Sequence, residues 1–191
     1  RRTGTIGAIF PTVDNAIFAK AIDALQRRLA EAGHQLLIAT CGYDPMVEES
    51  QALNLLARGA DGLVLCGCAQ RQSLLTRLRE RGVPVVHVMS WPLPTGFAGV
   101  GFDNARAIGQ AVRYLADLGH RRIAMLAGIA HDNDRAAARV RGFRDALNEA
   151  GLTLPAQRVV ERPYGLAAAR EGLRQLMDMS PAPTAVVCGN D

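Results

Sequence analysis

The feature that most constrains the fold of this chain is a repeated unit: an apolar run, a polar loop, an amphipathic helical pattern and then a glycine. Each of these glycines stands just past a helical pattern, where a left-handed C-cap favours a residue without Cβ. The glycines are Gly33, Gly59, Gly82, Gly119 and Gly151. Their spacing is close to the length of one βα unit. The repeat therefore predicts an α/β fold with doubly wound parallel sheets and right-handed crossovers.

The apolar runs are mostly continuous rather than alternating, which is typical of strands covered on both faces by helices. The predicted strands are Thr5 to Phe10, Gln35 to Thr40, Gly62 to Cys66, Pro84 to Met89, Ala98 to Phe102, Arg122 to Ala127, Arg158 to Glu161 and Thr184 to Cys188. The predicted helices are Ala16 to Ala32, Met46 to Arg58, Arg71 to Arg81, Ala105 to Leu118, Ala136 to Ala150 and Leu166 to Met179. The repeat is interrupted around residues 91–96, where we expect the chain to leave one sheet for another.

Composition excludes several classes of function. The 191 residues are 49% hydrophobic and 21% charged, yet no apolar run approaches the roughly 18 residues that span a bilayer, so no membrane partner is expected. The net charge is +4, and no basic run exceeds two residues. Because the positive charge is scattered, we expect that this segment does not bind DNA by itself.

Motifs for metal binding and catalysis are also missing. The four cysteines have no CxxC spacing, and Cys66-Gly67-Cys68 lacks a third ligand, so we expect neither a metal nor a cofactor. Cys66 and Cys188 end apolar runs and are predicted to be small buried thiols in a reducing cytoplasm. No phosphate loop, nucleophile elbow or HExxH motif occurs, so the chain is not expected to be an enzyme. His87, in the middle of a strand, is expected to be packed in the core.

Ligands of parallel sheets bind beyond the carboxyl ends of the strands, so the loops that follow the strands are the candidate site. These loops are Pro11 to Phe18, Cys41 to Asp44, Gly67 to Gln70, Met89 to Trp91, Asp103-Asn104, Gly128 to Arg139, Pro163-Tyr164 and Asn190-Asp191. They combine aromatic faces with hydrogen-bonding groups, which suits a sugar or a sugar acid. The aromatic candidates are Phe18, Trp91 and Tyr164, and the polar ones are Arg139, Asn190 and Asp191.

Four of these candidates have alternative interpretations. Phe18 lies at helical spacing and fits a core residue. Arg139 fits an ion pair with a surface carboxylate, and Asn190-Asp191 fit the cap of a following helix.

Seven stretches in this order cover essentially the whole chain and resemble the effector-binding region of LacI/GalR-type transcriptional repressors. They are Ile6-Gly7-Ala8-Ile9-Phe10-Pro11 with Asn15 and Phe18, Ala60-Asp61-Gly62-Leu63-Val64-Leu65, Gly82-Val83-Pro84-Val85-Val86, Val100-Gly101-Phe102-Asp103-Asn104, Leu118-Gly119-His120-Arg121-Arg122-Ile123-Ala124, Arg139-Val140-Arg141-Gly142-Phe143, and Pro183-Thr184-Ala185 through Asn190-Asp191. The fold that this resemblance implies is the two-lobed, type I fold of periplasmic sugar-binding proteins.

The resemblance implies an N-terminal lobe over residues 1–101, an incomplete C-terminal lobe over residues 102–191, and a cleft between them that binds a small-molecule effector. It further implies a homodimer in the cytoplasm that binds operator DNA through a helix-turn-helix domain upstream of Arg1. Effector binding would then favour one orientation of the two lobes over another. This change would alter the spacing between the two DNA-binding domains of the dimer. The abrupt start and end indicate a segment of a longer protein.

The resemblance also assigns individual residues. Arg139 corresponds to an arginine that bonds effector hydroxyls or a carboxylate, and Asn190-Asp191 to a pair facing the cleft. First-lobe contacts are implied for Asn15, Ile17 and Phe18, and an aromatic wall for Tyr164. One departure is the stretch Val88-Met89-Ser90-Trp91, which stands after the fourth strand where many members carry an acid. Met89 cannot accept a sugar hydroxyl, which argues against a neutral hexose.

Two further stretches point to one branch of the family. Gly42-Tyr43-Asp44-Pro45 with Glu48-Glu49, together with the stretch from Val100 to Asn104, is most similar to the gluconate-repressor branch. A sugar acid would suit Arg139, since a guanidinium can hold a carboxylate through two parallel bonds.

Two other classes of protein share these sequence features. A periplasmic sugar-binding protein of a transporter would have the same two lobes, although four cysteines and the match from Leu118 to Ile123 argue against it. A flavodoxin-like enzyme would have the same sheet, but it would need a phosphate loop that the sequence lacks.

Overall fold

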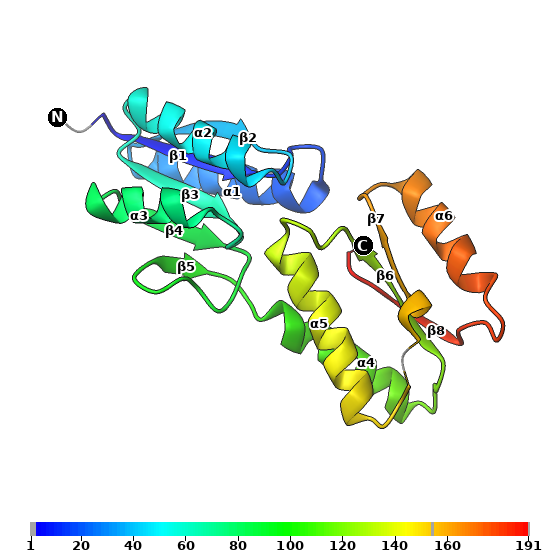
Figure 1. The fold of residues 1–191 in the computed structure, drawn as a ribbon. Coiled ribbons are helices and arrows are strands. Elements are labelled where there is room, and N and C mark those ends of the chain that lie inside the picture. The colour runs from blue at the N-terminus through cyan, green and yellow to red at the C-terminus, as the bar shows by residue number, and fades with distance from the viewer. Residues whose placement is uncertain (1–2, 154, 191) are drawn as a thin grey trace. The chain divides into compact units, whose positions relative to one another are not determined.

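The computed structural model describes residues 3–153 and 155–190, and the chain divides into two compact units, Arg1–Gly101 and Phe102–Asp191. Each unit is a parallel sheet with helices on both of its faces (Figure 1). The predicted α/β class with doubly wound parallel sheets is therefore confirmed. Among the described residues, the helices are too short or too polar to cross a bilayer.

The first unit has a five-stranded parallel sheet in the order β2-β1-β3-β4-β5. Its strands are β1 (Thr5–Phe10), β2 (Gln35–Thr40), β3 (Gly62–Cys66), β4 (Val85–Val88) and β5 (Ala98–Val100). Its helices are α1 (Ala16–Glu31), α2 (Pro45–Ala57) and α3 (Gln72–Glu80). Alternate residues of β1 face opposite sides, so Phe10 packs with Phe18 of α1, whereas Ile9 packs with the cluster under α2 and α3.

The second unit has a three-stranded parallel sheet in the order β7-β6-β8. Its strands are β6 (Ile123–Gly128), β7 (Val159–Arg162) and β8 (Ala185–Cys188), with a short 3-10 turn, η1 (Ala156–Arg158), before β7. Its helices are α4 (Asn104–Asp117), α5 (Asp134–Glu149) and α6 (Leu166–Met177). Residues of α4 and α5 share one core cluster, and Leu176 of α6 packs with Ala124 and Val160 in another.

The five glycines that define the repeat all end helices, as predicted. Their φ angles are positive, between 61° and 92°. At Gly33 the amide donates to Ala30, and the amide of His34 donates to Leu29, which is the paired bonding of a Schellman turn. The other four glycines and the residues after them bond in the same way. These turns return the chain to the amino ends of the strands.

The boundaries of the helices and strands differ from the predictions by only a few residues. Two other predictions, on the point where the chain leaves the first sheet and on the burial of Cys188, are wrong. The strand predicted to reach Phe102 ends at Val100 and still pairs with β4. The expectation that the chain leaves one sheet for another around residues 91–96 is therefore wrong, because the chain leaves the first sheet only after β5 and enters the second unit through α4. Cys188 is exposed, whereas burial was predicted. It ends β8, which lies at the edge of its sheet. His87 is fully buried, as predicted.

The start of β1 is tied to the loop before β3 by a single carboxylate. Asp61 Oδ2 accepts from the backbone N–H of Gly4 at 2.8 Å and of Thr3 at 2.9 Å. The hydrogen bond from Gly4 is the main reason why the pKa of Asp61 lies below its ordinary value, and the bonds from Thr3 add to it. Asp61 therefore anchors the residues that enter the first sheet.

Candidate functional site

A group of polar side chains in the second unit surrounds Arg139, which lies on α5. Its Nη1 donates to Oδ1 of Asn104 at 2.6 Å, and its Nη2 donates to the hydroxyl of Tyr164 at 3.2 Å. Asn104 is the first residue of α4 and is 2% exposed. The guanidinium is thus held by two residues that lie 35 and 25 positions away in the sequence.

Close packing of α4 against α5 brings Asn104 to Arg139. A Cβ at Gly142, one turn after Arg139, would overlap the backbone of Ala105. The helices can approach this closely because residue 142 has no side chain, which explains the glycine in the stretch from Arg139 to Phe143. In Figure 1 the two helices lie side by side along one face of the second sheet.

Tyr164 reaches the site because Gly128, the last residue of β6, leaves room for its ring. A Cβ at Gly128 would overlap the Tyr164 ring atoms. The hydroxyl also accepts from Nδ2 of Asn133 at 3.4 Å, and Asn133 caps α5 by accepting from the amide of Ala136. Residues that follow β6 and β7 therefore meet at the carboxyl edge of the sheet, as expected for a ligand site.

The guanidinium of Arg139 keeps donors that the protein does not use. Its Nε is buried and has no hydrogen-bond partner among the described residues. A buried N–H without a partner is unfavourable, so an acceptor supplied by a ligand would be stabilising here. Together with the amides and the hydroxyl around it, this side chain can hold a small polar molecule that carries several oxygen atoms.

The candidates at the start of the first unit have separate roles. Asn15 caps α1, with Oδ1 accepting from the amides of Ile17 at 2.9 Å and of Phe18 at 3.4 Å. The Ile17 side chain is exposed. Phe18 is 7% exposed, and its ring centroid lies 5.8 Å from that of Phe10, so the core interpretation describes its packing.

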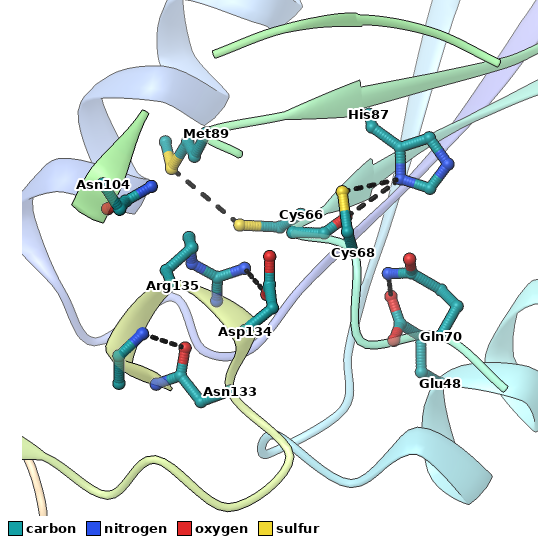
Figure 2. A network of polar contacts seen from close by, with 12 residues as sticks. Glu48, Cys66, Cys68, Gln70, His87, Met89, Asn104, Asn133, Asp134 and Arg135 are labelled. Carbon is teal, nitrogen blue, oxygen red and sulfur yellow. Dashed lines mark hydrogen bonds and ion pairs between the residues drawn. The ribbon is translucent and has the colours of Figure 1, made fainter. Parts of the chain in front are cut away.

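The candidates after β4 also differ from one another. Met89 has a φ of 69°, is half-buried, and its Sδ lies 3.9 Å from Sγ of Cys66, the last residue of β3 (Figure 2). Trp91 is exposed. The thioether therefore lies against sulfur and apolar atoms, at the position where the resemblance gives many family members an acid.

A second polar group lies near the carboxyl end of β3 in the first unit (Figure 2). Gln70 Nε2 donates to Oε1 of Glu48 at 2.9 Å, and both side chains are buried. Nδ1 of His87 lies 2.9 Å from the carbonyl oxygen of Gly67 and 3.9 Å from Sγ of Cys68. Over residues 3–153 and 155–190, no cluster of three or more His, Cys, Asp and Glu side chains is placed to hold a metal ion.

Two predicted residues come after β8. Asn190 follows the strand and is half-buried, and the backbone before it is fixed by the bond from the Gly189 amide to Leu126. Asp191 lies outside the described residues.

Sequence reasoning missed Asn104 and Asn133 as members of the site. Both asparagines lie in loops that the sequence identified as candidates. Asn133 is the N-cap of α5, and Asn104 directly follows Asp103, the N-cap of α4. The sequence does not distinguish an asparagine that only caps a helix from one that also binds a distant side chain.

Comparisons with known proteins agree with this architecture. Residues 3–191 match the family of periplasmic binding proteins and the sugar-binding domain of the LacI family. The chain is 30% identical over 97% of its length to the HTH-type transcriptional regulator GntR of Escherichia coli K12, and 31% identical over 99% to the HTH-type transcriptional repressor PurR of Salmonella newport. It spans 55% and 56% of these relatives, about half their length.

A solved structure gives the same result. A LacI family transcriptional regulator from Silicibacter pomeroyi is similar with a TM-score of 0.82 at 28% identity, over 96% of this chain and 68% of that one. The fold is therefore periplasmic-binding-protein-like, as the sequence predicted. The chain belongs to the family that comprises periplasmic binding proteins and the sugar-binding domain of the LacI family.

Proposed function

We propose that this chain is the effector-binding part of a ligand-responsive transcriptional repressor. Residues 1–101 and 102–191 serve as its N-terminal and C-terminal lobes. The similar proteins named above are regulators rather than enzymes or transport proteins, which favours this role over a transporter's binding protein. The whole protein would bind operator DNA in the cytoplasm as a homodimer, through a helix-turn-helix domain outside this segment.

The observation that carries the proposal is the arrangement around Arg139. A guanidinium with a buried, unused N–H, fixed by Asn104 and Tyr164, is suited to bind a small sugar or sugar acid. Such prearranged donors reduce the cost of ordering a site when ligand binds. We assign Arg139 as the principal effector contact.

The remaining contacts come from the loops after the strands. The proposed effector contacts besides Arg139 are Tyr164, Asn190, Asp191, Asn15, Ile17, Met89 and Trp91, with Phe18 supporting Asn15 and Ile17 from the core. Effector binding would shift the protein between two conformations of different operator affinity. A coupling free energy of about 1 to 3 kcal/mol would change that affinity about 5- to 150-fold.

The test uses the full-length protein and DNA from the region upstream of its own gene, at fixed salt concentration because phosphate contacts depend on salt. Fluorescence anisotropy first measures operator binding, and extracts of small metabolites are then screened for a fraction that changes it. Arg139→Ala should bind DNA like the wild type and lose the response.

Two results would contradict the proposal. A retained response in Arg139→Ala would remove this residue from the effector site. A full-length protein that binds sugar but no DNA would support the transporter's binding protein instead.

A further inference from the structure

The amino edge of the first sheet, where its strands begin, carries three exposed arginines without a hydrogen-bond or ion-pair partner among the described residues. They are Arg58 at the end of α2, Arg77 in the last turn of α3 and Arg81 directly after α3, and we call them the free arginines. The helix dipole favours a positive charge at these C-terminal positions. It does not occupy the N–H donors that each guanidinium presents, so these donors are available to another molecule.

Arginines at the amino edge of the second sheet have protein partners instead. Arg122, which directly precedes β6, donates through Nε to the carbonyl oxygen of Ala182 at 2.9 Å. Arg158, which directly precedes β7, donates through Nη2 to the carbonyl oxygen of Pro181 at 3.4 Å. These two side chains hold the loop before β8 in place. The free arginines hold no segment of the first unit in this way, so the fold does not account for them.

The carboxylates near the free arginines balance little of their charge. Oδ2 of Asp61 already accepts from two backbone amides, and Glu31 at the end of α1 pairs with Arg28. Glu80 is the remaining acidic residue in the last turns of α1, α2 and α3. This edge of the first unit therefore carries an excess of positive charge, which attracts a polyanion.

The free arginines lie at the end of the unit where the chain enters it. The Thr3 hydroxyl donates to the carbonyl oxygen of Gly59, which directly follows Arg58. The carbonyl oxygen of Pro84, shortly after Arg81, accepts from an amide of β3 at 2.9 Å. In Figure 1, α2 and α3 end where β1 starts. A domain attached before residue 3 would therefore join the first unit beside these arginines.

We propose that Arg58, Arg77 and Arg81 contact the phosphate backbone of DNA that the DNA-binding domain of the full-length protein holds. The inference rests on the proposed function, in which that domain precedes this segment. A guanidinium can donate two parallel hydrogen bonds to phosphate oxygens, so phosphate fits the unused donors. Three exposed charges bind DNA weakly on their own. Once the attached domain has bound the operator, tethering raises the effective concentration of phosphates at this edge and makes the contacts effective.

The test measures operator affinity of the full-length protein by fluorescence anisotropy, from about 75 to about 300 mM KCl and without effector. One variant combines Arg58→Gln, Arg77→Gln and Arg81→Gln. Each phosphate contact that is lost should reduce the slope of log affinity against log salt concentration by about 0.9. Affinity for DNA of random sequence should fall by the same factor as affinity for the operator, because phosphate contacts carry no sequence information.

The control variant removes the same charge from the second unit through Arg113→Gln, Arg144→Gln and Arg170→Gln, which are also exposed arginines. It should keep the salt dependence of the wild type, and circular dichroism checks that both variants are folded. An unchanged slope in the first variant would overturn the inference while operator binding and the proposed function stand. An equal loss in both variants would overturn it too, because total charge would then explain the effect. Absence of operator binding by the wild type would overturn the proposed function, and this inference with it.

Discussion

At the scale of single residues, three asparagines at the starts of helices have different roles. Asn15 only caps α1 in the contacts that the structure shows. Asn133 caps α5 and also donates to Tyr164, whereas Asn104 lies in the first turn of α4 and accepts from Arg139. Their local sequences are equally polar. Only the tertiary packing decides which amide reaches a partner far along the chain, so sequence alone identified the loops and not these two residues.

Tyr164→Phe should weaken the site while the ring keeps its place over Gly128. The change removes the acceptor for Arg139 and Asn133, so we expect the free energy of unfolding to fall by about 1 kcal/mol. Effector affinity should fall about tenfold as Arg139 loses a positioning contact. Urea denaturation and calorimetry measure the two effects.

The matched control is Tyr114→Phe on the exposed surface of α4. It should change stability by less than about 0.5 kcal/mol. Equal effects of the two substitutions would contradict a role for the Tyr164 hydroxyl.

Asp61→Asn should destabilise the protein at neutral pH, and the loss should disappear in acid. The pKa of Asp61 is lowered in the folded state by the N–H groups of Gly4 and Thr3, so its ionised form stabilises the fold. This contribution is complete above the ordinary value of 3.8 and is lost as the pH falls through the lower folded pKa. Denaturant titrations of both proteins between pH 7 and pH 2.5 should converge only below pH 3.8. A difference that stays constant across this range would show that charge is not involved.

At the scale of elements, helix ends were the most predictable feature. The glycines after five helices set the boundaries to within a few residues, because their positive φ angles are strongly unfavourable for other side chains. Contacts between helices were not predictable. The close approach of α4 to α5 depends on Gly142. From the sequence alone, this glycine only lowers the helix propensity of its segment, whereas in the structure it makes room for the backbone of Ala105.

Gly142→Ala and Gly109→Ala should have effects of opposite sign, although both lie in the helices of this pair. An added Cβ at Gly142 overlaps the backbone of Ala105, so we expect a loss of about 1 to 3 kcal/mol in the free energy of unfolding. The nearest atoms to an added Cβ at Gly109 are those of the flexible Arg113 side chain at 3.4 Å and of Ala146 at 3.7 Å, which are ordinary contact distances. There, the higher helix propensity of alanine should stabilise the protein by up to about 1 kcal/mol.

Thermal or urea unfolding of both variants measures this contrast. Because the overlap at residue 142 would also separate Asn104 from Arg139, Gly142→Ala should weaken effector binding as well. If both variants prove stabilising, α4 and α5 do not pack as closely as the structure has them.

At the scale of the whole molecule, each unit has its own hydrophobic core. Leu65 belongs to a cluster of the first unit and Leu147 to a cluster of the second. The interruption of the repeat around residues 91–96 predicts a change of sheet at that point, and this prediction is wrong, because β5 follows the interruption and pairs with β4 of the first sheet. That pairing depends on the register between β4 and β5, which no local pattern encodes.

Leu65→Ala and Leu147→Ala should each destabilise only the unit that contains the substitution. Both side chains are buried, and truncation should cost about 2 to 5 kcal/mol. Hydrogen exchange followed by mass spectrometry should show faster exchange in the amides of the affected unit, which opens as a cooperative block. Equal acceleration in both units would show that they unfold as one.

The residues at the amino ends of the strands and those at the carboxyl ends have different roles. The glycine turns lie before the strands, at the amino ends, whereas Arg139, Tyr164 and their neighbours lie after the strands at the carboxyl ends. A gene for such a chain can accumulate changes in ligand range after duplication without disturbing the turns on which folding depends. For the same reason, a biosensor library that randomises residues 129–131 and keeps the α5 cap Asn133, Tyr164 and Gly165 should retain a large fraction of folded clones.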